Sequence, residues 1–193
     1  MAKLILSSCD FRNAKSSKVI YDNLPKSIEQ CRVLFFPNEK ATGEKILSGR
    51  YHDRLCEFGF SKDYITVFNY FSPNFNDTDT TDVVYISGGN TFGTMKRLCE
   101  SGADVIIRSC IDRGAVYIGG SAGAHIASSS IEHVSKYDAD TYGLNDYTGL
   151  GLFDGILICH YCEERRADRD ELAMQNKYRV YTLGDSDSVV IDI

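Results

Sequence analysis

The stretch that decides the fold is residues 115–128, which read AVYIGGSAGAHIAS. Its four apolar residues, 115–118, predict a short buried strand, and the small residues after them predict a sharp turn into a helix. Residues 119–123 form a Gly-x-Ser-x-Gly pattern, which between a strand and a helix is typical of a nucleophile elbow. Such a turn strains the serine backbone and admits only small neighbours, here Gly119, Ala122 and Gly123. We therefore expect Ser121 above the sheet edge, at a helix N-terminus; the alternative is a tight turn with a buried serine.

Short apolar runs alternate with helical patterns along the rest of the chain. This alternation predicts an α/β fold: a mostly parallel sheet with helices on both faces, in one domain spanning residues 1–193. The expected strands are residues 4–6, 32–36, 64–68, 83–86, 115–118, 156–159, 180–183 and 189–191. The expected helices are residues 16–24, 43–59, 92–101, 104–113 and 163–176, with polar loops at 72–82 and 130–148.

The composition restricts the class of protein. The chain has 193 residues, of which 43% are hydrophobic and 25% charged, as in an ordinary globular domain. Its net charge of −6 argues against a broad nucleic-acid or anionic-membrane surface. No apolar run approaches the length of a membrane span, and the N-terminus reads as a strand rather than a signal peptide. Seven scattered cysteines, an odd number, favour reduced thiols and a cytoplasmic location.

Three polar features follow strands of the predicted sheet: Gly88-Gly89-Asn90, Ser121 and His160. In parallel sheets, functional groups gather at the carboxyl ends of strands, so we expect these three to lie together. A serine hydroxyl needs a base, usually histidine, to become a nucleophile. His160 ends a predicted strand at the edge where Ser121 should lie, and we choose it as the base. A core-edge histidine bonded to a backbone carbonyl is the alternative.

The other three histidines fit the role of base less well. His125 lies one turn beyond Ser121, and the helix should point it away from the open side of the elbow. His52 is expected on the surface of a helix, and His133 in the solvated polar loop.

A carboxylate should orient the histidine of a catalytic triad. Asp185, in the turn after residues 180–183, is our first choice, with Asp187 beside it. Asp138 and Asp140, after the elbow helix, are rivals. Each of these residues is also a plausible turn residue.

Backbone N–H groups should stabilise the oxyanion of such a reaction. Those of Ala122, directly after the nucleophile, and of Gly89 are the candidates. Asn90 or Thr91 is expected to cap the following helix, and Asn90 is expected to face the substrate. A phosphate cradle is the alternative use of Gly88-Gly89, but the motif lacks the Lys-Ser/Thr of a P-loop and the third glycine of a dinucleotide site.

A metal site is not expected. The pattern Cys159-His160-Tyr161-Cys162 has no second cysteine pair, so it is weak support for zinc, and Cys159 should belong to the core. No cofactor is expected either.

Three segments together resemble a known family. They are Ser-Gly-Gly-Asn-Thr-Phe at 87–92, Gly-Gly-Ser-Ala-Gly-Ala at 119–124, and the apolar strand that ends in His160 with three arginines beyond it. They are similar to the peptidase E family, which contains aspartyl dipeptidases and, more distantly, cyanophycinases. The resemblance runs from about residue 83 to the end of the chain; earlier residues share only the βα rhythm.

The resemblance implies a three-layer α/β fold related to class I glutamine amidotransferases and a serine peptidase without metal. It assigns the nucleophile to Ser121, the base to His160 and the oxyanion donors to Gly89 and Ala122. At the acid position, Asp185 stands where a glutamate would be expected.

The resemblance also implies an aspartate preference, which requires a cation near the scissile bond. Arg166 and Arg169 lie where the family keeps arginines, although a solvated helix face with i,i+4 pairs explains them equally well. The expected function is hydrolysis of short peptides, with an N-terminal aspartate as one candidate substrate. A catalytically silent binding protein, or an amidase or esterase, is the alternative. A short peptide is the expected partner, nucleic acid and membrane are not, and a homodimer is left open.

Overall fold

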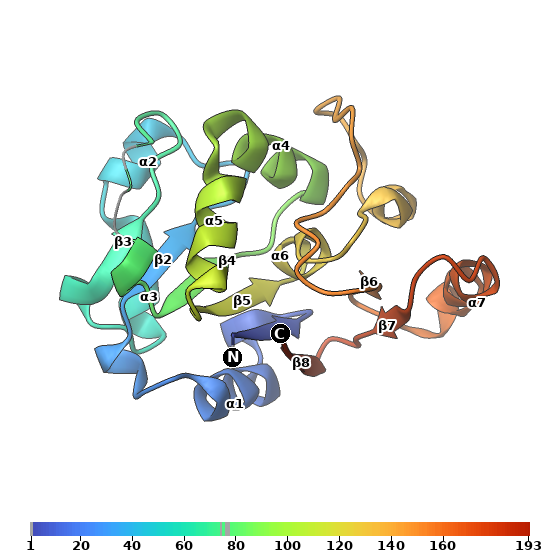
Figure 1. The fold of residues 1–193 in the computed structure, drawn as a ribbon, viewed down its shortest axis with the longest axis horizontal. Coiled ribbons are helices and arrows are strands. Elements are labelled where there is room, and N and C mark those ends of the chain that lie inside the picture. Colours follow the sequence, from blue (N-terminus) through green and yellow to red (C-terminus); the bar gives the residue numbers. More distant parts are fainter. Residues whose placement is uncertain (1, 74, 76–77) are drawn as a thin grey trace.

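The computed structural model describes residues 2–73, 75 and 78–193. Its centre is a six-stranded sheet in the order β3-β2-β4-β5-β1-β8, which is parallel except for β8 (Figure 1). These strands are β1 (Lys3–Ser7), β2 (Val33–Phe36), β3 (Ile65–Val67), β4 (Val83–Ile86), β5 (Val116–Gly120) and β8 (Ser188–Asp192). A second, parallel pair comprises β6 (Ile156–Ile158) and β7 (Val180–Thr182).

The helices connect these strands in the predicted alternation. They are α1 (Ala14–Asn23), α2 (Gly43–Leu47), α3 (Arg50–Glu57), α4 (Thr91–Ser101), α5 (Ala103–Asp112), α6 (Ala122–Ile126) and α7 (Arg166–Met174). Short 3₁₀ turns complete the connections, and the three that bear on the site are Asp10–Arg12, Glu132–Lys136 and Glu163–Arg165.

Two hydrophobic cores, one on each face of the sheet, give the molecule its three layers. Successive strand residues point to opposite faces, so Leu4 and Leu6 join one core and Ile5 joins the other. The first core packs against α4, α5 and α6, and the second against α1 and α3. The expected mostly parallel α/β architecture is therefore confirmed.

The structure differs from the sequence expectation in two places. The helix expected over residues 43–59 is two helices, because Gly49 adopts φ +80° between α2 and α3. The strand that leads to His160, β6, forms a two-stranded sheet with β7 and lies outside the main sheet, at the end of the molecule that carries α7 (Figure 1). The expected loop at 72–82 falls partly outside the described residues, whereas 130–148 is irregular as expected.

The site lies at the carboxyl ends of β1, β4 and β5, which are adjacent in the sheet or nearly so. The end of β6 reaches the same region through α6, which contacts both β5 and β6. In the described part of the chain, every helix is too short or too polar to cross a lipid bilayer.

Candidate active site

Ser121 occupies a strained turn between β5 and α6. Its backbone has φ +49° and ψ −107°, which is unusual for any residue other than glycine. The Ser121 N–H donates to the Ser7 carbonyl at 2.8 Å, and the Ser121 carbonyl accepts from the N–H groups of Ala124 and His125. Bonds on both sides of the serine thus hold the turn in the conformation expected of an elbow.

The small residues around the elbow are required by close backbone contacts. A side chain on Gly119 would place its Cβ 2.7 Å from the carbonyl oxygen of Gly123. A side chain on Gly123 would collide with the carbonyl of Ile86, in the neighbouring strand β4. Only glycine at both positions allows α6 to begin directly against β4 and β5.

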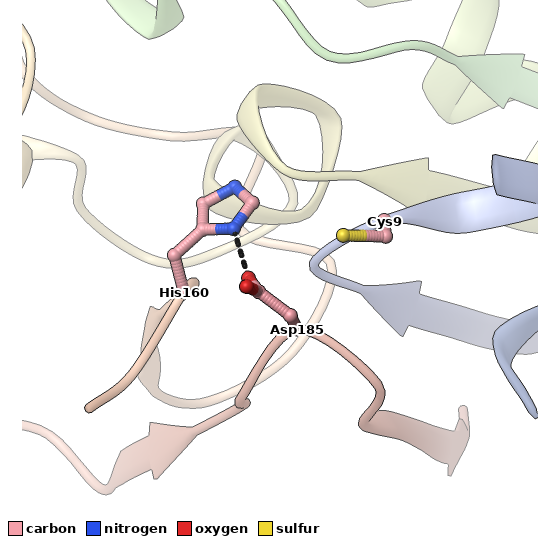
Figure 2. A group of neighbouring side chains, drawn as sticks. All are labelled: Cys9, His160 and Asp185. Carbon is pink, nitrogen blue, oxygen red and sulfur yellow. Dashed lines mark hydrogen bonds and ion pairs between the residues drawn. The ribbon is translucent and has the colours of Figure 1, made fainter. Parts of the chain in front are cut away.

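The structure brings Ser121, His160 and Asp185 together. Ser121 Oγ lies 3.0 Å from His160 Nε2, and His160 Nδ1 lies 2.6 Å from Asp185 Oδ1, as Figure 2 shows for the second pair. The arrangement corresponds to a protonated Nδ1 that donates to the carboxylate, which leaves Nε2 free to accept the serine proton. The side chains of His160 and Asp185 are 40% and 74% exposed, so this is an open site at the molecular surface.

Hydrogen bonds from distant strands fix the position of His160. Its backbone has φ +52°, and its N–H donates to Ser8 Oγ at 3.0 Å. The same hydroxyl donates to the carbonyl of Leu183 at 2.9 Å, directly after β7. Ser8 therefore links the end of β1 to the ends of β6 and β7, and so links the two sheets across the site.

The rival carboxylates are engaged elsewhere. Asp187 accepts from the Gly184 N–H within its own turn. Asp138 accepts from the Thr91 N–H at the start of α4, and Asp140 accepts from three backbone N–H groups and one tyrosine hydroxyl. Of the four candidates, Asp185 is the one whose carboxylate reaches His160.

The other histidines do not reach Ser121. His125 is buried and bonded at both ring nitrogens: Nε2 accepts from the Cys159 N–H at 3.2 Å, and Nδ1 lies 3.3 Å from Thr91 Oγ1. Burial, aided by the nearby His133, lowers its pKa to about 3. The expectation that His133 is solvated is wrong, since it is 6% exposed and its Nε2 bonds the Leu157 carbonyl. His52 is half-buried on α3.

The two proposed oxyanion donors flank the elbow. Ala122 is the first residue of α6, so its N–H has no acceptor one turn earlier in the helix. Gly89 lines the cavity that contains Ser121. Behind Gly89 lies Glu39, a buried carboxylate that accepts from the Asn90 N–H and from Thr94 Oγ1; a Cβ at Gly89 would collide with it. Glu39 thus packs against the loop that carries Gly89.

The three expected substrate contacts are used within the protein. Asn90 caps α4 through a bond from the Gly93 N–H, and its amide donates to the carbonyl of Ala139. Arg166 pairs with Glu163 at 2.7 Å, and Arg169 pairs with Asp170 at 2.6 Å. The structure does not bring any of the three to the cavity beside Ser121.

A cavity of about 430 Å³ opens beside Ser121 and His160. Its other lining residues are Cys9, Arg12, Asn13, Gly88 and Gly89. The first three follow β1 and were missed by the sequence reasoning. Because β1 is parallel and adjacent to β5, its carboxyl end also meets the elbow, and the polar run Ser-Ser-Cys-Asp at 7–10, where β1 ends, was an available signal.

Within the described residues, one group of side chains has the donor atoms for a metal ion: Cys9, His160 and Asp185. Their ligand atoms lie within 4.8 Å of one another, and Figure 2 shows Cys9 facing the His160–Asp185 pair from the end of β1. Burial, aided by the negative charge of Asp185, raises the pKa of the Cys9 thiol. The Cys159–Cys162 pattern does not form a site, since Cys159 is buried in the core, where its pKa rises to about 12, and Cys162 is exposed.

Known proteins share this fold and part of this sequence. A crystal structure described as a candidate peptidase E protein from Listeria monocytogenes superposes with a TM-score of 0.71 and 21% identity, covering 100% of this chain and 99% of the other. A peptidase from an acI-B1 Actinobacterium superposes with a TM-score of 0.63 and 13% identity, covering 99% and 83%. At these identities the likeness concerns the fold.

Curated relatives match over a shorter stretch. An uncharacterized peptidase of Pasteurella multocida is 38% identical over 82 residues, which are 42% of this chain and 40% of the relative. Peptidase E of Escherichia coli O1:K1 is 42% identical over 83 residues, 43% of this chain and 35% of the relative. The matched stretch therefore spans less than half of either relative. The model of peptidase family S51, in contrast, matches residues 4–192, and the chain belongs to that family.

Proposed function

We propose that this protein is a serine peptidase that hydrolyses short peptides through an acyl-enzyme. One observation carries the proposal: a strained elbow holds Ser121 Oγ 3.0 Å from His160 Nε2, while Asp185 engages the other ring nitrogen at 2.6 Å. This is the geometry of a nucleophile, a general base and an orienting carboxylate. Membership of family S51 and the peptidase names of its relatives support it.

In the first half of the reaction, Ser121 Oγ attacks the carbonyl carbon of the scissile peptide bond. His160 Nε2 takes the hydroxyl proton, and Asp185 stabilises the resulting imidazolium. The carbonyl oxygen becomes an oxyanion that accepts from the N–H groups of Gly89 and Ala122; loss of one such donor typically costs about 3–4 kcal/mol of transition-state stabilisation. His160 then gives its proton to the leaving amine as the C–N bond breaks.

In the second half, a water molecule attacks the acyl-enzyme. His160 takes a proton from this water, and the same N–H groups hold the second oxyanion. When the bond between Ser121 Oγ and the acyl carbon breaks, the proton on His160 returns to Oγ. The acid product leaves, and no electron transfer or metal is needed at any step.

The size of the site supports a short substrate. A cavity of about 430 Å³ lies in the lower part of the size range of small-ligand pockets, in keeping with a dipeptidase. All seven cysteines lie among the described residues as free thiols. Thiols stay reduced in the cytoplasm, so this cysteine usage supports a cytoplasmic location.

A fluorophosphonate probe tests the proposal directly, because it labels only an activated serine. We expect labelling of the wild-type protein and its loss in Ser121→Ala, while the matched variant Ser135→Ala, on an exposed 3₁₀ turn, stays labelled. Failure of the wild type to label would instead favour a binding protein on the same scaffold. Where labelling occurs, dipeptides compared with simple esters distinguish a peptidase from an esterase.

A further inference from the structure

Arg12 is the one permanently charged side chain among the residues that line the cavity beside Ser121. The other lining residues are neutral or, like His160, titratable. Since the chain as a whole carries a net charge of −6, a cation next to the nucleophile is not explained by a generally basic surface. Arg12 is a local feature of the site.

The Arg12 side chain is held from behind by a buried carboxylate. Its Nε donates to Asp10 Oδ1 at 3.2 Å, and the Asp10 side chain is 0% exposed while that of Arg12 is 54% exposed. Asp10 in turn accepts a hydrogen bond from the Tyr85 hydroxyl at 3.0 Å. Asp10 also packs directly against Gly120, where any side chain would collide with the Asp10 carboxylate. The anchor therefore lies in the 3₁₀ turn after β1 and is held against β4 and β5, the strands beside the elbow.

This anchor leaves most of the guanidinium available. An arginine offers five N–H donors, and the Nε–H is the one that Asp10 engages. Among the described residues, Asp10 is the only hydrogen-bond or ion-pair partner of the Arg12 side chain. The two Nη groups are thus free for a ligand, and a planar fork of this kind matches a carboxylate.

The free end of Arg12 lies close to the nucleophile. A Cβ on Gly88 would sit 3.2 Å from Arg12 Nη2 and 3.3 Å from Ser121 Cβ, so both side chains border one point of the cavity. A group bound to Nη2 would lie next to the scissile bond held over Ser121. Arg166 and Arg169, in contrast, pair with acidic neighbours in the segment around α7 and do not line the cavity.

We propose that Arg12 binds a carboxylate of the peptide substrate and so sets the specificity of the site. This inference rests on the proposed peptidase function. Two groups of a peptide present this chemistry beside the scissile bond: an acidic side chain on the residue whose carbonyl is attacked, and the terminal carboxylate of a dipeptide. The substrate set below distinguishes them.

The experiment compares Asp-Leu with Asn-Leu, which lacks the side-chain charge, and with Asp-Leu amide, which lacks the terminal charge. In Arg12→Gln we expect kcat/KM for the recognised substrate to fall about 10- to 100-fold, mainly through KM, as for the loss of a charge-assisted contact. In the same variant, the preference for Asp-Leu over one of the two neutral analogues should disappear. If that analogue is Asn-Leu, Arg12 binds the side-chain carboxylate; if it is Asp-Leu amide, Arg12 binds the terminal carboxylate. Arg12→Lys should restore part of the activity, since it keeps the charge without the fork.

Lys15→Gln is the matched control. It removes the same charge from an exposed residue of α1 that does not line the cavity, and it should leave all three substrates unaffected. Fluorophosphonate labelling of Ser121 separates the two proposals. Unchanged kcat/KM and discrimination in a labelled Arg12→Gln protein would overturn the role of Arg12 alone. Absence of labelling in the wild type would overturn the peptidase itself. Loss of labelling in a folded Arg12→Gln would show that Arg12 acts on the nucleophile rather than on specificity.

Discussion

The hydroxyl of Ser8 accepts a hydrogen bond from the backbone N–H of His160, 152 positions away in the chain, at 3.0 Å. Through its second bond, to the Leu183 carbonyl, Ser8 joins the main sheet to the β6–β7 pair. The distance between Ser121 and His160 therefore depends on a contact between two sheets rather than on either sheet alone.

We predict that Ser8→Ala lowers kcat about 10-fold with little change in KM. The variant removes the bond that holds His160 at φ +52°, and small errors of position cost rate rather than affinity. Steady-state kinetics on a dipeptide measures the effect. Ser135→Ala, whose hydroxyl bonds only a carbonyl within its own turn, is the control. Equal kinetics in both variants would contradict a positioning role for Ser8.

His160 and His125 should respond differently to substitution. We expect His160→Ala to abolish turnover, by about 1,000-fold or more, without loss of stability, because its ring is partly exposed. His125→Ala should retain most of its turnover per folded molecule but lose about 2–4 kcal/mol of stability, since it leaves a buried N–H of Cys159 without an acceptor. Urea denaturation and kinetics on the same samples separate the two effects, and equal losses of turnover would show that the base is misassigned.

Asp185→Asn should lower kcat/KM by about 10- to 100-fold. We expect a smaller loss than for a fully buried triad carboxylate, because water can partly replace a side chain that is 74% exposed. Asp187→Asn, two residues away, is the matched control and should stay near wild type, since its carboxylate bonds only the turn. A larger effect at Asp187 would reassign the acid.

Stability should fall as the pH drops from about 6.5 towards 4. Burial lowers the pKa of His125 from its usual 6.5 to about 3, and it lowers that of His133 as well. The unfolded chain binds these protons near pH 6.5 while the folded chain does not, so each unit of pH below that value costs up to about 1.4 kcal/mol per histidine. Melting temperatures across this range measure the slope. His125→Gln should flatten it, and an unchanged slope would assign the acid sensitivity elsewhere.

Local sequence alone was enough for the α/β architecture and for the elbow. Apolar runs of four or five residues bounded by turn residues favour short buried strands. The glycines at 119 and 123 favour a tight turn, and in the structure a Cβ on Gly119 would collide with the carbonyl of Gly123. The choice of His160 rested on a local rule, that a side chain at a strand end lies near the edge where ligands bind. The rule found the residue, although β6 belongs to a separate two-stranded sheet and meets the elbow through α6.

What only the tertiary structure decided is which side chains share the site. His133 lies in a polar segment, yet packing against β6 buries it. The hydrophobic spacing predicts one helix over residues 43–59, but Gly49 divides it into two. Cys9 and Arg12 enter the cavity because β1 pairs with β5 across more than a hundred residues. The sequence of each segment determines its hydrophobic periodicity. Burial, charge pairing and distance depend instead on which residues are neighbours in space, and strand order decides those neighbours.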